Sequence, residues 1–287
     1  MALGHVVLMV FIQVAWGVNI LAAKFSLAEI PPLFFTALRF GAVALIYLPW
    51  VQWHPRRFKV ILLIAFSGGA LHFGLFFLGL AYAGDIAPVA IAIQLNAPFA
   101  TILSFLVLGE RARPHQIVAL ALAFGGVMVI AYDPRVVEYL WPLLLVCAAA
   151  LAWATGAMLM RRTTDLHVFD LQGWIALVTF PAVGLASFVL ETGQLESTAN
   201  ASTLAWVGLV YTVFGGAIFG HAGLNWLIHR YQVAQIAPFM LLSPVVGGLL
   251  GVWLLGDVLT WRMVVGGALT LGGVLLVTTR PRHIRLR

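Results

Sequence analysis

Charged residues are scarce in this chain, and their scarcity excludes an ordinary soluble fold. Only 9% of the 287 residues are charged and 62% are hydrophobic, whereas a soluble domain carries about 25% charged residues. So few charges cannot cover a water-facing surface, so the apolar residues must face lipid. The sequence therefore predicts an integral membrane protein with the lipid bilayer as its main partner.

Cysteine and enzymatic motifs are also nearly absent. The single Cys147 excludes an internal disulfide framework and a cysteine-based metal cluster. The sequence contains no HExxH, acidic metal-binding cluster, P-loop or GxSxG pattern. We therefore expect no metal, no cofactor and no enzymatic activity.

Long apolar runs dominate what is present. A membrane about 30 Å thick requires roughly 20 apolar residues of helix, and the runs do not alternate as barrel strands would. They predict an all-α protein with ten transmembrane helices over residues 4–23, 32–51, 59–82, 86–108, 114–131, 138–160, 169–190, 204–228, 233–255 and 261–279.

The basic residues are distributed unevenly between the two sets of loops. The loops after the even-numbered spans and the C-terminal tail hold twelve of the sixteen, the opposite loops hold Lys24, Arg135 and Arg262, and Arg39 lies within the second span. This asymmetry predicts that both termini are cytoplasmic. It also explains the high sequence pI without nucleic acid as a partner. We expect a bacterial-type cytoplasmic (inner) membrane location.

An internal repeat divides the chain. Gly68-Gly69-Ala70 matches Gly215-Gly216-Ala217 at an offset of 147 residues. The blocks at 108–110 and 125–127 match 255–257 and 272–274 at the same offset. Each unit has five spans, so the second must be inverted relative to the first. The predicted units are residues 1–133 and 134–287, an arrangement typical of secondary transporters. One chain then holds both units, so we expect a functional monomer.

Two prolines interrupt matching spans. Pro98 lies near the middle of the fourth span and Pro244 near the middle of the ninth. Proline removes a backbone donor and frees the carbonyl four residues earlier, and paired interruptions point to a transporter's binding site and hinges. The alternative is that both prolines merely bend their helices.

These features together resemble the drug/metabolite transporter superfamily, and specifically its ten-helix EamA-type branch. The resemblance rests on Leu38-Arg39-Phe40, on the segments from Pro98 to Glu110 and from Ser243 to Asp257, and on the paired Gly-Gly-Val blocks. It covers nearly the whole chain and is closest to amino-acid exporters, including those for aromatic amino acids. It implies a central cavity, with the fifth and tenth spans peripheral.

Polar and aromatic residues within the spans are the candidates for substrate binding. Gln13 and Trp16 share one face of the first span, where a polar stripe should face the protein interior. His72 and Phe76 share a face of the third span, and His221 and Asn225 share one of the eighth. The remaining candidates are Gln94, Trp153, Phe239 and Ser243. For each residue the alternative is a structural role in linking or packing helices.

Two charge observations bear on the substrate. No acidic residue lies near the centre of a predicted span, unlike the membrane-embedded glutamate of the four-helix multidrug relatives. Arg39 is the only charge well inside a span, and a structural role by snorkelling or by holding a carbonyl is favoured. The sequence therefore predicts an exporter of small neutral or zwitterionic metabolites, foremost amino acids. The alternatives are hydrophobic drugs or sugars as substrates, a channel or scramblase, and a membrane enzyme.

Overall fold

The structure is a computed structural model that describes residues 1–109, 111–160, 163, 166–228, 230–231 and 233–279. Every regular element within these ranges is helical, which confirms the all-α prediction. Ten described segments are long and apolar enough to cross a membrane, and they coincide with the predicted spans: Leu3–Leu27, Pro32–Trp50, Phe58–Tyr82, Ile86–Val107, Pro114–Ala131, Leu140–Met160, Val168–Leu190, Thr203–Leu224, Gln235–Leu255 and Trp261–Thr278.

Several spans consist of more than one helical element. The helical elements of the first half are α1 (Leu3–Leu27), α2 (Pro32–Tyr47), η1 (Leu48–Trp50), α3 (Phe58–Ile64), η2 (Ala65–Leu71), α4 (His72–Tyr82), α5 (Ile86–Ala92), η3 (Ile93–Leu95), α6 (Asn96–Leu108) and α7 (Pro114–Ala131). The helical elements of the second half are α8 (Pro134–Val137), α9 (Leu140–Met160), α10 (Val168–Leu190), α11 (Gln194–Ala199), α12 (Thr203–Tyr211), η4 (Thr212–Gly220), α13 (His221–Ile228), α14 (Val233–Met240), α15 (Leu242–Leu250), η5 (Gly251–Leu255) and α16 (Trp261–Thr279).

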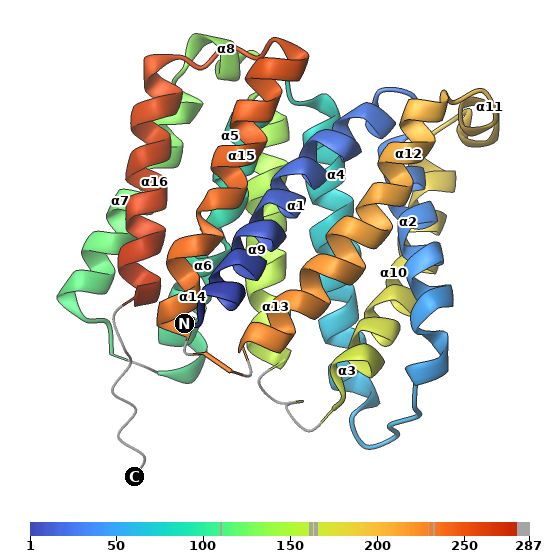
Figure 1. The fold of residues 1–287 in the computed structure, drawn as a ribbon. Coiled ribbons are helices and arrows are strands. Elements are labelled where there is room, and N and C mark those ends of the chain that lie inside the picture. The colour runs from blue at the N-terminus through green and yellow to red at the C-terminus, as the bar shows by residue number, and fades with distance from the viewer. Residues whose placement is uncertain (110, 161–162, 164–165, 229, 232, 280–287) are drawn as a thin grey trace.

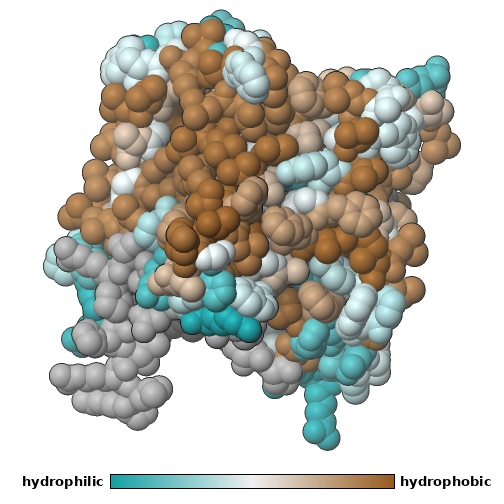
Figure 2. Space-filling view, in the orientation of Figure 1, coloured by the Kyte–Doolittle hydropathy of each residue, from teal (hydrophilic) through white to brown (hydrophobic). Residues whose placement is uncertain are grey.

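The helices form one bundle in which α1 begins and α16 ends at the same end, called here the terminal end (Figure 1). The basic loop between α2 and α3 lies at that end. Apolar side chains form a broad belt around the middle of the visible face, with hydrophilic residues gathered above and below it (Figure 2). This distribution suits a protein surrounded by lipid.

Helices α7 and α16 pack against each other at one side of the bundle (Figure 1). A methyl group on Gly126 would meet the backbone of Gly266, and one on Gly273 would meet the backbone of Ala123. Two of the repeated glycines therefore allow close helix approach, as small residues do in membranes. Neither helix contributes to the central cavity described below.

The two Gly-Gly blocks of the repeat lie in π-helical segments. η2 and η4 surround Gly68-Gly69 and Gly215-Gly216, and their first residues, Ala65 and Thr212, are separated by the repeat offset of 147. His72 and His221 follow these segments directly. Such segments are rare and frequently occur at functional sites. The sequence analysis did not predict them.

The fourth and ninth spans are interrupted just before their central prolines. In the fourth span the 3₁₀ turn η3 separates α5 from α6 and ends three residues before Pro98. In the ninth span Leu241 lies between α14 and α15, three residues before Pro244. The missing proline donors account for both interruptions. The structure shows the breaks, whereas the hinge role remains a prediction.

The segment of residues 191–202, between the seventh and eighth spans, contains the short helix α11. The first residue of the segment, Glu191, accepts hydrogen bonds from the backbone N–H groups of Leu33 (2.7 Å) and Phe34 (3.0 Å) at the start of α2. Capping of these otherwise unpaired donors by a carboxylate stabilises the helix end. The segment therefore links the two halves of the chain.

Candidate functional site

A central cavity of about 220 Å³ lies between the two halves of the bundle. Its walls come from spans 1–4, 6, 8 and 9, and they combine aromatic rings with polar side chains. The lining residues are Gln13, Trp16, Asn19, Ile20, Arg39, His72, Phe73, Ile93, Gln94, Asn96, Trp153, Gly216, His221, Leu224, Met240 and Ser243. The helix breaks at η3 and Leu241 adjoin this wall, so non-helical backbone lies beside a cavity rather than against lipid.

The structure brings most of the predicted site residues together. Those that line the cavity are Gln13, Trp16, His72, Gln94, Trp153, His221 and Ser243. They come from helices widely separated along the chain. Their contact with a substrate remains a prediction.

Two predicted site residues, Phe76 and Phe239, do not line the described cavity. Phe76 is buried behind His72, with their rings stacked at a centroid distance of 6.2 Å. Phe239 packs on the cluster of Met9, Ile12, Leu227 and Ile236, because α14 turns that face toward α1 and presents Met240 to the cavity instead. The side chain of Asn225 lies outside the described residues.

Aromatic and imidazole rings form a continuous row along the wall. The Trp16 indole donates a hydrogen bond to the carbonyl of Gly216 (3.1 Å) and lies 5.5 Å from the His221 ring. Trp153 lies 6.5 Å from His221 and 5.0 Å from His72. The Nδ1 of His72 is 2.8 Å from the carbonyl of Ala149. A carbonyl only accepts, so Nδ1 carries the proton and Nε2 is the acceptor of the neutral ring.

Arg39 lies in the wall of the cavity and is only 3% exposed. Its Nε donates to the carbonyl of Thr212 at 3.3 Å, so it holds a carbonyl as expected but does not snorkel out of the span. Its guanidinium carbon lies 4.8 Å from the centroid of Phe73 and 5.3 Å from that of Phe77. Each ring offers a cation–π contact.

Three polar atoms of the wall have no hydrogen-bond partner. They are Oε1 of Gln13, Oδ1 of Asn19 and Nη1 of Arg39, and all are buried. Buried polar atoms are nearly always paired, so each unpaired one requires an explanation. Two unpaired acceptors and one unpaired cationic donor among the lining residues match a solute that bears both an ammonium group and a carboxylate.

The sequence analysis missed Asn19, Arg39, Phe73 and Asn96 as lining residues. Asn19 is off the face shared by Gln13 and Trp16, and it lines the cavity where it packs against Gly216 of η4. The charge of Arg39 inside a span was the available signal, since an intramembrane ionisable residue is a functional candidate by default.

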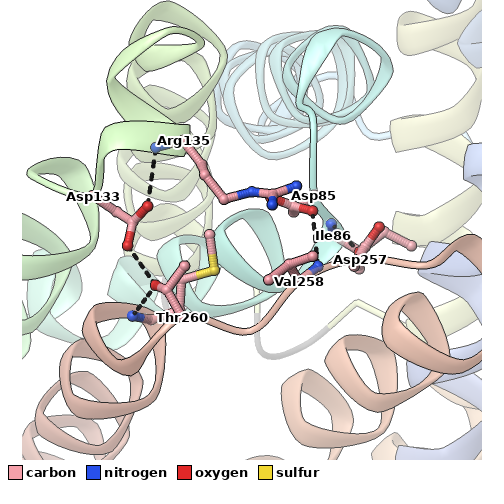
Figure 3. Close-up of polar contacts among 8 residues, drawn as sticks. Asp85, Ile86, Asp133, Arg135, Asp257, Val258 and Thr260 are labelled. Atoms are coloured by element: carbon pink, nitrogen blue, oxygen red, sulfur yellow. Dashed lines mark hydrogen bonds and ion pairs between the residues drawn. The ribbon is translucent and has the colours of Figure 1, made fainter.

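A network of carboxylates joins the two halves at the end opposite the terminal end (Figure 3). The carboxylate of Asp85 accepts from the N–H of Val258 (3.4 Å), and that of Asp257 accepts from the N–H of Ile86 (2.7 Å). Arg135 forms an ion pair with Asp85 at 3.6 Å. The start of α5 is thereby tied to the loop that precedes α16, and this end of the bundle is called here the closed end.

Small residues pack tightly between this network and the cavity. A methyl group on Gly17 would collide with Val246 of α15, and one on Gly251 would meet the carboxylate of Asp257. Nearby, the ammonium of Lys24 donates to the carbonyls of Leu80 (2.9 Å) and Ala83 (2.6 Å) at the end of α4. These contacts fix α1 against α4 and α15 on the closed side.

The sequence profile of the EamA-like transporter family matches residues 4–132 and again 140–279. The chain belongs to this family. Membership places it in the drug/metabolite transporter superfamily, as the sequence motifs indicated, and makes it an integral membrane transporter.

Similar proteins include named exporters. A probable amino-acid metabolite efflux pump of Escherichia coli K12 is 28% identical over 276 residues, which cover 93% of this chain and 92% of the relative. A probable terminal-alkyne amino-acid exporter of Streptantibioticus cattleyicolor is 30% identical over 196 residues, or 67% of this chain and 63% of the relative. A solved crystal structure that covers 96% of both chains superposes with a TM-score of 0.61 at 20% identity, which shows a shared fold.

Proposed function

We propose that this protein is a secondary exporter of small neutral or zwitterionic metabolites, with amino acids as the principal class. The family supplies the transporter role, and two relatives are named as probable exporters of amino acids or their metabolites. The chemistry of the central cavity supports the same substrate class independently of those names.

The observation that carries the proposal is the composition of the cavity wall. It combines one guanidinium, unpaired amide oxygens and aromatic rings, and no acidic residue lies among the described lining residues. A cationic drug would lack a counter-charge here, and a polyanion would need several cations. The cavity of about 220 Å³ is also below the roughly 300–1,000 Å³ of pockets for drug-sized ligands.

The proposed mechanism is alternating access between two inverted five-helix units, residues 1–133 and 134–287, within one monomer. The described parts of α13 and α14 have no extensive contact with α6 or α9, whereas α1, α5 and α15 pack closely on the other side of the cavity. We assign the terminal end to the cytoplasmic side of a bacterial inner membrane, because the described parts of the basic loops that follow α2 and α6 lie there. The cavity then loads from the cytoplasm.

Release requires the closed end to open. The proposed hinges are the interruptions before Pro98 and Pro244, where the helical hydrogen bonding is already broken. Rocking of the two units would separate Asp85 from Val258 and Asp257 from Ile86, and the substrate would leave on that side.

Reconstituted liposomes test this proposal directly. We expect saturable counterflow of labelled phenylalanine, methionine and threonine, with little flux of glutamate, lysine or a dicationic dye. Protein-free liposomes and the heat-inactivated protein are the controls. Equal flux of the dye and the neutral amino acids would reject the assigned substrate class.

Hydrophobic drugs or sugars are the second candidate class. The indoles of Trp16 and Trp153 and the ring of Phe73 give the wall an aromatic character that suits flat apolar molecules or sugar faces. Inhibition of phenylalanine counterflow by neutral aromatic drugs or by hexoses, at concentrations where other amino acids do not compete, would favour this class.

A further inference from the structure

The guanidinium of Arg39 is the only permanent charge among the described lining residues of the central cavity. Arg39 belongs to the membrane span Pro32–Trp50 and lies away from both ends of that span. At 3% exposure it does not reach either surface of the bundle. A charge in this position is unfavourable unless it has a partner.

No carboxylate among the described residues pairs with Arg39. Its hydrogen bond to the Thr212 carbonyl uses Nε, whereas Nη1 is buried without a partner. The aromatic rings of Phe40, Phe73 and Phe77 surround the cation but carry no charge. The protein thus holds the planar group firmly and leaves one of its donors unused.

One of the unused acceptors, Oδ1 of Asn19, lies beside the same π-helical segment. Asn19 packs at Gly216, one turn beyond the Thr212 carbonyl that holds Arg39. The Oδ1 of Asn19 and the Oε1 of Gln13 both lack donors. η4 therefore adjoins both a cationic donor and an amide acceptor, a pattern that complements a molecule with two opposite charges.

We infer that Arg39 is the carboxylate-binding residue of the cavity and that its missing counter-ion is the carboxylate of the transported solute. Asn19 and Gln13 accept hydrogen bonds from the ammonium group of the same solute. This inference rests on the proposed function and narrows it: a free carboxylate is required, so amino acids bind, whereas their amides and the corresponding amines bind poorly.

A set of four probes with one phenyl side chain tests the requirement for each group. Phenylalanine carries both charges, phenylalaninamide and phenethylamine lack the carboxylate, and 3-phenylpropionate lacks the ammonium. Binding is measured as the shift in thermal unfolding temperature of the purified protein in detergent. We expect phenylalanine to bind about tenfold or more tightly than the two amines, with 3-phenylpropionate between them.

The variant R39Q should lose about tenfold or more in affinity for phenylalanine and for 3-phenylpropionate, while its weak binding of phenethylamine stays the same. R39K keeps the charge and should retain part of the preference, although without the planar donor geometry. R56Q is the matched control, because Arg56 is an exposed loop residue outside the cavity, and it should bind like the parent.

Several outcomes would overturn the inference. They are equal binding of phenethylamine and phenylalanine by the parent, an unchanged carboxylate preference in R39Q, stabilisation by chloride equal to that by 3-phenylpropionate, or no binding of any probe. The comparison of probes on the parent needs no variant, so a misfolded R39Q does not remove the test. Carboxylate-dependent binding without counterflow would support Arg39 as the binding residue and reject the exporter proposal.

Discussion

Charges at the closed end of the bundle bond to each other or to the opposite half, whereas the charge in its centre has a buried donor, Nη1 of Arg39, that is left unpaired. Asp85 and Asp257 each accept a backbone N–H from the opposite half, and Arg135 pairs with Asp85. Arg39, more deeply buried, has no acidic partner within the described chain. The difference separates two uses of polar groups in a membrane protein. Paired groups hold helices together, and an unpaired group is available to a solute.

Replacing Arg39 and Asp257 should therefore have opposite consequences. Arg39→Met removes a buried charge that has no ionic partner, so the unfolding temperature should not fall, while phenylalanine counterflow should drop by about 30-fold to 1,000-fold, or about 2–4 kcal/mol. Asp257→Ala leaves the Ile86 N–H without its acceptor and should destabilise the fold by about 1–3 kcal/mol.

Thermal unfolding and counterflow on the same preparations decide between these expectations. A large stability loss in Arg39→Met with an intact carboxylate preference would show that Arg39 is structural. An unchanged unfolding temperature in Asp257→Ala would show that the closed end does not depend on this hydrogen bond.

The α7–α16 contact offers a purely structural site for comparison. Gly126→Ala places a methyl group against the backbone of Gly266 and should destabilise by about 1–3 kcal/mol. The neighbouring Gly125 has open space, so Gly125→Ala is the matched control and should be neutral or slightly stabilising. Selectivity among the phenyl probes should be the same in both variants, and a change in Gly126→Ala alone would mean that this contact shapes the cavity.

The paired helix interruptions give a kinetic test. Pro98→Ala combined with Pro244→Ala restores the helical donors, which should straighten both spans and slow counterflow about fivefold to tenfold with little change in affinity. Pro181 lies inside α10, away from the described cavity lining, so Pro181→Ala is the control. Counterflow at the parent rate in the double variant would exclude these interruptions as hinges.

The smallest expected effect concerns pH at the closed end. Burial raises the pKa of Asp257 above its ordinary value, and the Ile86 N–H, Lys24 and Arg135 only partly offset this while Asp85 adds to it. The folded state then binds the proton more tightly than the unfolded state, so stability should fall as pH rises from the ordinary carboxyl pKa through the raised one. The difference between the parent and Asp257→Asn should amount to less than about 2 °C. An opposite slope would indicate that the ionised carboxylate is the favoured form.

Much of the cavity wall was predictable from polar residues inside apolar spans. Gln13, Trp16, His72, Trp153 and His221 line it, because lipid offers no hydrogen bonds and such side chains must turn inward. The residues that were wrongly included or left out also have a physical explanation. Helical spacing places Phe76 beside His72 but does not tell which ring faces the space. Asn19 of α1 packs against Gly216 of η4, and regular periodicity cannot show that these two distant residues meet.

By itself, the sequence determined the membrane environment, the number of spans, the family and the sites of the helix breaks. Each follows from local properties, since apolar length and proline chemistry act along the chain. Only the tertiary structure decided which polar groups meet and which are left unpaired. The carboxylate of Asp257 has a structural role, because an N–H from the other half lies 2.7 Å away. No described carboxylate lies beside the Arg39 guanidinium, which is surrounded by aromatic rings. Whether a polar group is paired depends on which groups from distant parts of the sequence lie beside it, and only the packing of the bundle decides that.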